Sequence, residues 1–174
     1  PNGGPVYFAN DGGVVRSTNG GTTFENLNQT LTLAQFNGVS VHPTDSTIFF
    51  GGTQDNGTMR AKASATWSDR IGGDGGFNLV HATDPTKVFA TREYANMHYS
   101  ETTGDSFVNP SPCTTLLDCA NGNGKETMAF YAPIAAAPAA PDTIFFGSQR
   151  VWASTTFGKK ADGWEPRSPG PVFG

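Results

Sequence analysis

The sequence has little charge, no basic cluster and no long hydrophobic run. Only 15% of its 174 residues are charged, and its eleven lysines and arginines are scattered along the chain, with Lys159 and Lys160 as the one adjacent pair. A nucleic-acid-binding surface needs a basic patch or stripe, so the composition argues against a nucleic-acid partner. The longest weakly polar run, FYAPIAAAPAAP, is short and broken by three prolines, so no membrane span is predicted.

Cysteine is also scarce, with only Cys113 and Cys119 in the chain. Their spacing does not match a zinc site and no second pair follows, so no metal centre is predicted. We expect a disulfide that closes a small loop, which would indicate an oxidising compartment. A pair of unlinked thiols is the alternative.

Glycine and proline are plentiful, with 22 and 12 residues, and 11% of the chain is aromatic. Together with the low charge, this composition favours many short strands joined by turns over helices. Aromatic side chains supply the volume that the core of such a protein needs. The length suffices for one domain with a sizeable core.

The chain repeats itself. Residues 39–52, VSVHPTDSTIFFGG, match residues 78–91, NLVHATDPTKVFAT, and residues 143–147 repeat TIFFG from residues 47–51. Each unit runs from an apolar strand through a Pro/Asp turn to a second strand. A third strand then leads into a glycine-rich turn, and an aromatic residue opens a fourth. Four short strands per about 40 residues is the size of a β-propeller blade.

We therefore predict an all-β chain, a β-propeller segment of four-stranded antiparallel blades over residues 1–174. The approximate blades are residues 1–35, without an innermost strand, and residues 36–74, 75–127 and 128–174. A propeller closes with about 4–8 blades, so we expect further blades from the parent chain or another chain. A self-contained four-blade ring is the alternative.

The stretch RSTNGGTTF combines a glycine pair with hydroxylated residues and a terminal aromatic. Its residues Ser17, Asn19, Gly21, Thr23 and Phe24 resemble the Asp-box of BNR repeats, whose pattern is Ser-x-Asp-x-Gly-x-Thr-Trp. Asn and Phe here replace the Asp and the Trp. The resemblance implies a secreted or cell-surface β-propeller in which this hairpin is structural and lies on the blade periphery.

Weaker copies of the hairpin follow. One contains Ser100, Gly104 and Phe107, and the copies in residues 60–67 and 154–164 are expected to be out of register. Asp-boxes occur in sialidases, sortilin-type receptors and xyloglucanase-like glycosidases. The resemblance therefore implies the fold more strongly than the activity.

Other Gly- and Asp-rich loops are better candidates for a binding site. Asp11, Gln54, Asp55 and Asn56 follow second strands, and Asp74 lies in the GGDGG segment that joins two blades. Loops of these two kinds open on the same end of a propeller. Their carboxylates and amides can form hydrogen bonds with sugar hydroxyls or coordinate Ca²⁺ through their oxygens. No other cofactor is predicted. Turn formation is the alternative, because Asp-Gly and Asn-Gly are strong turn formers.

A glycosidase needs two carboxylates, and Asp11 and Asp74 are the pair that we would name. Their surroundings loosely resemble those of the catalytic aspartates of xyloglucanase-like glycosidases. In those enzymes the two acids come from two facing propellers, so a pair within one segment departs from the pattern. A sialidase is less well supported, because its Phe/Tyr-Arg-Ile-Pro motif does not appear.

We therefore expect a non-catalytic propeller segment that binds a glycan or protein partner, or that helps to build an extracellular assembly. The alternative is part of a glycoside hydrolase that acts on an extracellular polysaccharide. Glu93 and Tyr94 lie where they would line the blade-end surface. The insertion at residues 108–127, which holds both cysteines, is the candidate for partner contact, because long loops on rigid scaffolds often carry recognition.

Overall fold

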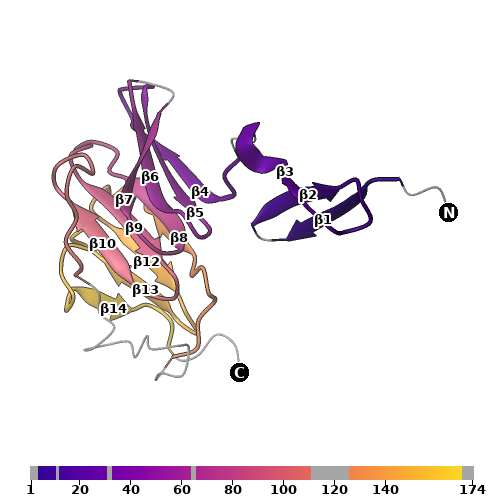
Figure 1. Cartoon of the computed structure of the whole chain (residues 1–174). Coiled ribbons are helices and arrows are strands. Elements are labelled where there is room, and N and C mark those ends of the chain that lie inside the picture. Colours follow the sequence, from indigo (N-terminus) through magenta and orange to yellow (C-terminus); the bar gives the residue numbers. More distant parts are fainter. Residues whose placement is uncertain (1–3, 11, 31–32, 64–65, 111–125, 170–174) are drawn as a thin grey trace. The chain divides into compact units, whose positions relative to one another are not determined.

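The computed structural model describes residues 4–10, 12–30, 33–63, 66–110 and 126–169 (Figure 1). Strands dominate these residues, and the one helical element among them is the short 3-10 helix η1 (Asn28–Thr30). No helix in the described ranges is long and apolar enough to cross a membrane. Contacts divide the chain into two compact units, Pro1–Leu33 and Ala34–Gly174, which we describe separately.

The first unit contains one antiparallel sheet in the order β1-β2-β3. Its strands are β1 (Val6–Asn10), β2 (Gly13–Ser17) and β3 (Glu25–Asn26). The β1 strand, VYFAN, aligns with the second strands of the later repeats. Among the described residues of this unit, the sheet therefore has no counterpart of the innermost strand, as the sequence predicts.

The second unit contains three antiparallel sheets that follow one another along the chain. The first comprises β4 (Phe36–Val41), β5 (Ile48–Thr53), β6 (Gly57–Lys62) and β7 (Trp67–Ile71). The second comprises β8 (Gly75–Val80), β9 (Val88–Arg92) and β10 (Met97–Ser100), and Val108 adds a single bridge to Tyr99. The third comprises β11 (Ile134–Ala136), β12 (Ile144–Gly147), β13 (Val151–Ser154) and β14 (Trp164–Pro166).

We call the sheet of the first unit blade 1 and the sheets of the second unit blades 2, 3 and 4. All four are antiparallel and each follows one predicted repeat. The prediction of an all-β fold with about four blades is confirmed. The predicted blade boundaries and the single-segment organisation remain predictions.

The second strand of each later blade contributes a buried phenylalanine to the core. Phe50 of β5 and Phe89 of β9 are fully buried, and Phe146 of β12 is 1% exposed. Dense apolar strands of this kind are expected where another sheet packs against them. Phe50 packs with Ile48 and Val88 between blades 2 and 3. A larger cluster joins blades 3 and 4 and contains Phe89, Met97, Tyr99, Ile144, Phe146, Trp152, Phe157 and Trp164.

Blades 2 and 3 approach each other closely through glycines. A Cβ added at Gly52 of β5 would lie 1.8 Å from the carbonyl oxygen of Gly76, and one at Gly75 of β8 would lie 2.3 Å from that of Gly57. A residue with a side chain does not fit at either position. Gly75 of GGDGG is thus explained by backbone packing, and this approach places Asp74 beside the loop after β5.

Ser64, in the predicted copy at residues 60–67, lies outside the described residues. The other three predicted Asp-box hairpins share one pattern of hydrogen bonds. In each, a serine Oγ accepts a hydrogen bond from the glycine amide four residues later: Gly21 to Ser17 at 2.9 Å, Gly104 to Ser100 at 3.0 Å and Gly158 to Ser154 at 3.1 Å. The expectation that the copy at Ser154 is out of register is wrong. Ser154, Thr156 and Gly158 keep the spacing of the first copy, and Phe157 takes a positive φ of 53° at the turn.

These hairpins also pack against the preceding blade. A Cβ at Gly104 would lie 2.5 Å from Cε1 of Phe50, and one at Gly158 would lie 2.3 Å from Cε2 of Phe89. Phe107 packs on the cluster between blades 2 and 3, and Trp164 is buried between blades 3 and 4. Within the second unit, the hairpins thus provide contacts between blades.

Replacing Ser154 by alanine is expected to lower the free energy of unfolding by about 1–3 kcal/mol, because it leaves buried backbone amides without their acceptor. Ser154 has no exposed surface and its Oγ accepts from the amides of Thr156 and Gly158. Urea unfolding measures the change. Thr155→Ala, at an exposed position of the same turn, is the control, and an equal loss in both variants would contradict the assignment.

Candidate functional site

Asp74 lies where three blades meet at one end of the second unit. Its Oδ1 accepts a hydrogen bond from the amide of Asp55 at 2.9 Å and one from the hydroxyl of Tyr131 at 3.4 Å. Asp55 belongs to the loop between β5 and β6, and Asp74 directly precedes β8. Tyr131 belongs to the segment that leads into β11. Loops of two predicted kinds therefore do meet at one end of the sheets.

The loop after β5 forms a tight, exposed turn. Asp55 has a φ of 62°, a left-handed conformation that Asp tolerates better than most residues. Asn56 donates its side-chain amide to the carbonyl oxygen of Gln54 at 3.1 Å. Gln54, Asp55 and Asn56 are exposed, so their remaining polar groups face solvent. The Asn56 side chain serves the turn, and the Asp55 side chain is exposed to solvent.

Tyr94, Phe130 and Tyr131 form an aromatic cluster beside Asp74, and sequence reasoning missed its last two members. The amide of Tyr94 donates to the carbonyl oxygen of Phe130 at 2.6 Å, and Tyr94 also forms a parallel bridge with Tyr131. The ring centroid of Phe130 lies 5.3 Å from that of Tyr94 and 4.8 Å from that of Tyr131. Burial raises the pKa of the Tyr131 hydroxyl, which therefore stays protonated and donates to Asp74.

The repeat contained a signal for this cluster. Residues 130–133 precede the first strand of blade 4 just as residues 72–74 precede the first strand of blade 3. Residues in equivalent positions of a repeat open on the same end, so alignment of the units places the aromatic pair at the same end as Asp74 but does not show that they touch.

A charged group continues this surface. Nη2 of Arg92, at the end of β9, lies 2.9 Å from Oε1 of Glu93. The backbone of Gly73 packs directly against the guanidinium of Arg92. This contact ties the segment that carries Asp74 to blade 3, so the position of the aspartate depends on two neighbouring blades.

His98 of β10 is largely buried near Arg92. Burial, with a smaller contribution from the charge of Arg92, lowers its pKa to about 4. Its Nε2 has no hydrogen-bond partner among the described residues. His98 is therefore neutral in the folded protein at neutral pH.

The free energy of unfolding is expected to fall as the pH drops from 7 to 4.5. The unfolded chain protonates His98 below its ordinary pKa near 6.5, whereas the folded chain does not until about pH 4. Between these pH values the unfolded state binds more protons than the folded state. The free energy of unfolding at pH 4.5 is therefore about 2 kcal/mol lower than at pH 7. Denaturant titrations at several pH values measure this slope. His98→Gln should reduce it, and identical slopes for both proteins would contradict the prediction.

Glu126 is a buried carboxylate near the loop that joins β12 and β13. Its Oε1 lies 3.0 Å from Nε of Arg150, and its Oε2 accepts hydrogen bonds from Nε1 of Trp152 at 3.0 Å and from the hydroxyl of Ser148. With both oxygens engaged, Glu126 holds this loop in place. Sequence reasoning did not single it out.

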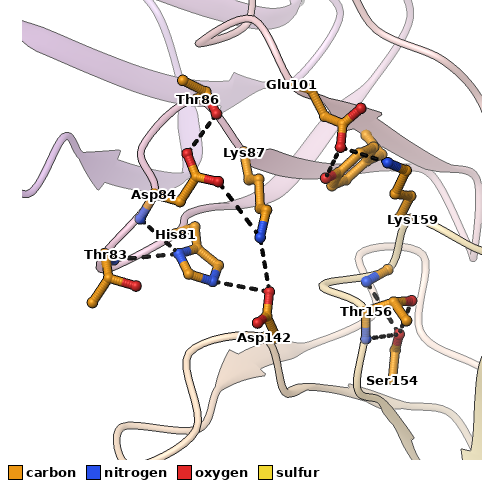
Figure 2. Close-up of polar contacts among 12 residues, drawn as sticks. His81, Thr83, Asp84, Thr86, Lys87, Glu101, Asp142, Ser154, Thr156 and Lys159 are labelled. Atoms are coloured by element: carbon orange, nitrogen blue, oxygen red, sulfur yellow. Dashed lines mark hydrogen bonds and ion pairs between the residues drawn. The ribbon is translucent and has the colours of Figure 1, made fainter.

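The two repeated histidines serve turns. Nδ1 of His81 accepts hydrogen bonds from the amides of Thr83 and Asp84 at 3.2 and 2.9 Å (Figure 2). His42 accepts from the amides two and three residues later in the same way. Since Nδ1 is an acceptor, the proton of neutral His81 is on Nε2, which lies 3.2 Å from Oδ1 of Asp142 in blade 4.

Ion pairs also join blades 3 and 4. Nζ of Lys87 lies 3.0 Å from Oδ1 of Asp142, and Nζ of Lys159 lies 2.6 Å from Oε1 of Glu101 (Figure 2). Lys87 lowers the pKa of the Asp142 carboxyl, and Lys159 lowers that of Glu101. Each of these charged groups has a partner, so we assign these ion pairs to packing between blades 3 and 4.

Three predicted residues lie outside the described residues, namely Asp11, Cys113 and Cys119. The pairing of Asp11 with Asp74 and the disulfide therefore remain predictions. Among the described residues, no group of three or more His, Cys, Asp or Glu side chains is arranged to hold a metal ion.

Comparison with known proteins supports the fold. The chain matches no protein-family model and no curated protein. Among solved structures, an ancestral GH74 enzyme superposes with a TM-score of 0.58 at 17% identity, covering 96% of this chain and 22% of the other.

Two further structures agree. The GH74 xyloglucanase from Xanthomonas campestris gives a TM-score of 0.53 at 16% identity, covering 96% of this chain and 29% of the other. The GH74 enzyme of Niastella koreensis gives 0.56 at 18% identity, covering 90% and 26%. The chain thus spans less than a third of these enzymes. At this identity the likeness shows a propeller fold like that of GH74 enzymes.

Proposed function

We propose that this chain is part of a β-propeller glycoside hydrolase and contributes a polysaccharide-binding end, with Asp74 as one of its two acids. The observation that carries the proposal is the meeting of Asp74, the Asp55 loop and Tyr131 at one end of three blades. Its likeness in fold to three GH74 structures supports this class over others. We place the protein outside the cell or on its surface, where polysaccharides occur.

The surroundings of Asp74 suit proton transfer. Both hydrogen bonds that Asp74 accepts from the described residues fall on Oδ1, which leaves Oδ2 for a substrate hydroxyl or a water. The neutral hydroxyl of Tyr131 orients the carboxylate without neutralising it. Glycoside hydrolysis needs a second acid across the scissile bond, and Asp11 remains our candidate for it.

A non-catalytic glycan-binding segment is the second candidate. The observation that favours it is that Asp74 already accepts a turn amide from Asp55, as a purely structural aspartate does. Asp55, Gln54 and Asn56 would then bind sugar hydroxyls, and a Ca²⁺ ion or a protein partner would remain possible ligands of the same loops.

One experiment separates the two candidates. The chain is incubated with a panel of plant polysaccharides and sialylated glycans, and both reducing-end release and binding are measured. Reducing ends that appear with the wild-type chain and not with Asp74→Asn or Asp11→Asn support the hydrolase. Binding without release supports the second candidate, and neither binding nor release overturns both.

A further inference from the structure

We infer that Phe130, held between Tyr94 and Tyr131, is a stacking platform for a pyranose ring whose hydroxyls are equatorial. This inference rests on the proposed function and adds a specific subsite to it. We call Tyr94, Phe130 and Tyr131 the aromatic ledge.

The ledge is exposed at its centre. Phe130 is 43% exposed although it is a large apolar side chain. Tyr94 and Tyr131, on its two sides, are only half-buried. Exposed aromatic groups beside polar residues are typical of binding sites.

The ledge is also rigid. The amide of Tyr94 donates to the carbonyl oxygen of Phe130 at 2.6 Å, and the bridge between Tyr94 and Tyr131 fixes the two segments to each other. Their rings meet that of Phe130 at steep angles of 71° and 82°. A ring held in this way loses little conformational entropy when it binds a ligand.

The backbone conformation of Tyr94 also supports a binding site. Its φ of 58° is uncommon for a residue with a bulky side chain. Such conformations persist where the surroundings enforce them and cluster at binding sites. Here the conformation directs the backbone amide of Tyr94 to the carbonyl oxygen of Phe130.

The neighbours of the ledge identify the class of ligand. Tyr131 connects the ledge directly to Asp74 through a 3.4 Å hydrogen bond. A flat apolar surface next to a carboxylate fits a molecule with one apolar face and a rim of hydroxyls. A pyranose with equatorial hydroxyls has this shape, because its axial C–H groups lie against the electron-rich face of the aromatic ring while its hydroxyls reach the carboxylate.

The test measures binding of cellohexaose to the 174-residue chain by isothermal titration calorimetry. Phe130→Leu keeps an apolar side chain but loses the flat ring, and we expect its Kd to rise about five- to tenfold. Phe130→Tyr keeps the ring and should bind within about twofold of the wild type. Val41→Ala, at a 50% exposed apolar residue at the end of β4, is the control and should leave Kd unchanged.

The outcomes separate the ledge from the proposed function. Unchanged binding by Phe130→Leu, with wild-type binding intact, would overturn the ledge and leave the proposed function standing. Failure of the wild type to bind any glycan of the panel would overturn the proposed function and the ledge with it. Mannohexaose, whose rings carry an axial hydroxyl, should bind more weakly than cellohexaose, and stronger binding would overturn the assigned ligand shape.

Discussion

Under the proposed function, Asp74→Asn is expected to abolish hydrolysis of the polysaccharide while it leaves the fold intact. An asparagine side chain has nearly the same shape, and its carbonyl oxygen can still accept from the amide of Asp55 and the hydroxyl of Tyr131. What it loses is the ability to transfer a proton. Loss of a general acid or base lowers kcat by about 10²- to 10⁴-fold, whereas Kd for the glycan should change much less.

The matched control is Asp69→Asn, which removes a carboxylate from the outer strand β7 of blade 2. Its kcat should equal that of the wild type, and thermal unfolding of both variants should stay close to the wild-type transition. If Asp74→Asn keeps the full kcat on a substrate that the wild type hydrolyses, Asp74 is not an acid of the reaction.

Phe89→Ala is expected to cause a large loss of stability. Phe89 has no exposed surface, and it belongs to the cluster that joins blades 3 and 4. Truncation of a fully buried phenylalanine costs about 3–5 kcal/mol, through lost burial and the cavity left behind. A loss of that size is a large fraction of the free energy of unfolding of a typical domain, which is about 5–15 kcal/mol. Chemical denaturation with two spectroscopic probes measures it.

Phe130→Ala removes the same side chain at a 43% exposed position and is the control for this prediction. It should lower the free energy of unfolding by less than about 1 kcal/mol. Equal losses in the two variants would show that the contact between blades 3 and 4 does not carry the stability of the second unit.

The strands were predictable because their cause is local. Dense apolar runs such as IFFGG and VFATR repeat with the blade period, and Gly-rich turns punctuate them. The same periodicity identified the hairpins at Ser17 and Ser100. It failed for the register of the hairpin at Ser154, where Phe157 occupies a turn position at which a glycine is easier to recognise.

The candidate site was predictable only in part. Asp55 and Asp74 lie in Gly-rich loops, which can be recognised from the sequence alone. Tyr131 stands 57 residues from Asp74, and nothing in the residues between them reports that their side chains meet. Glu126 was missed for a similar reason, because its burial depends on Trp152 and Arg150 from a different hairpin.

Our central claim is that the hairpins are structural and that the blade end around Asp74 is the functional surface. It is tested most directly by NMR mapping of backbone amides during titration with cellohexaose. We predict that the amides of Asp55, Gly73 and Tyr131 shift, while those of Gly104 and Gly158 in the hairpins do not. Shifts confined to the hairpins, with the amides around Asp74 unchanged, would contradict the account.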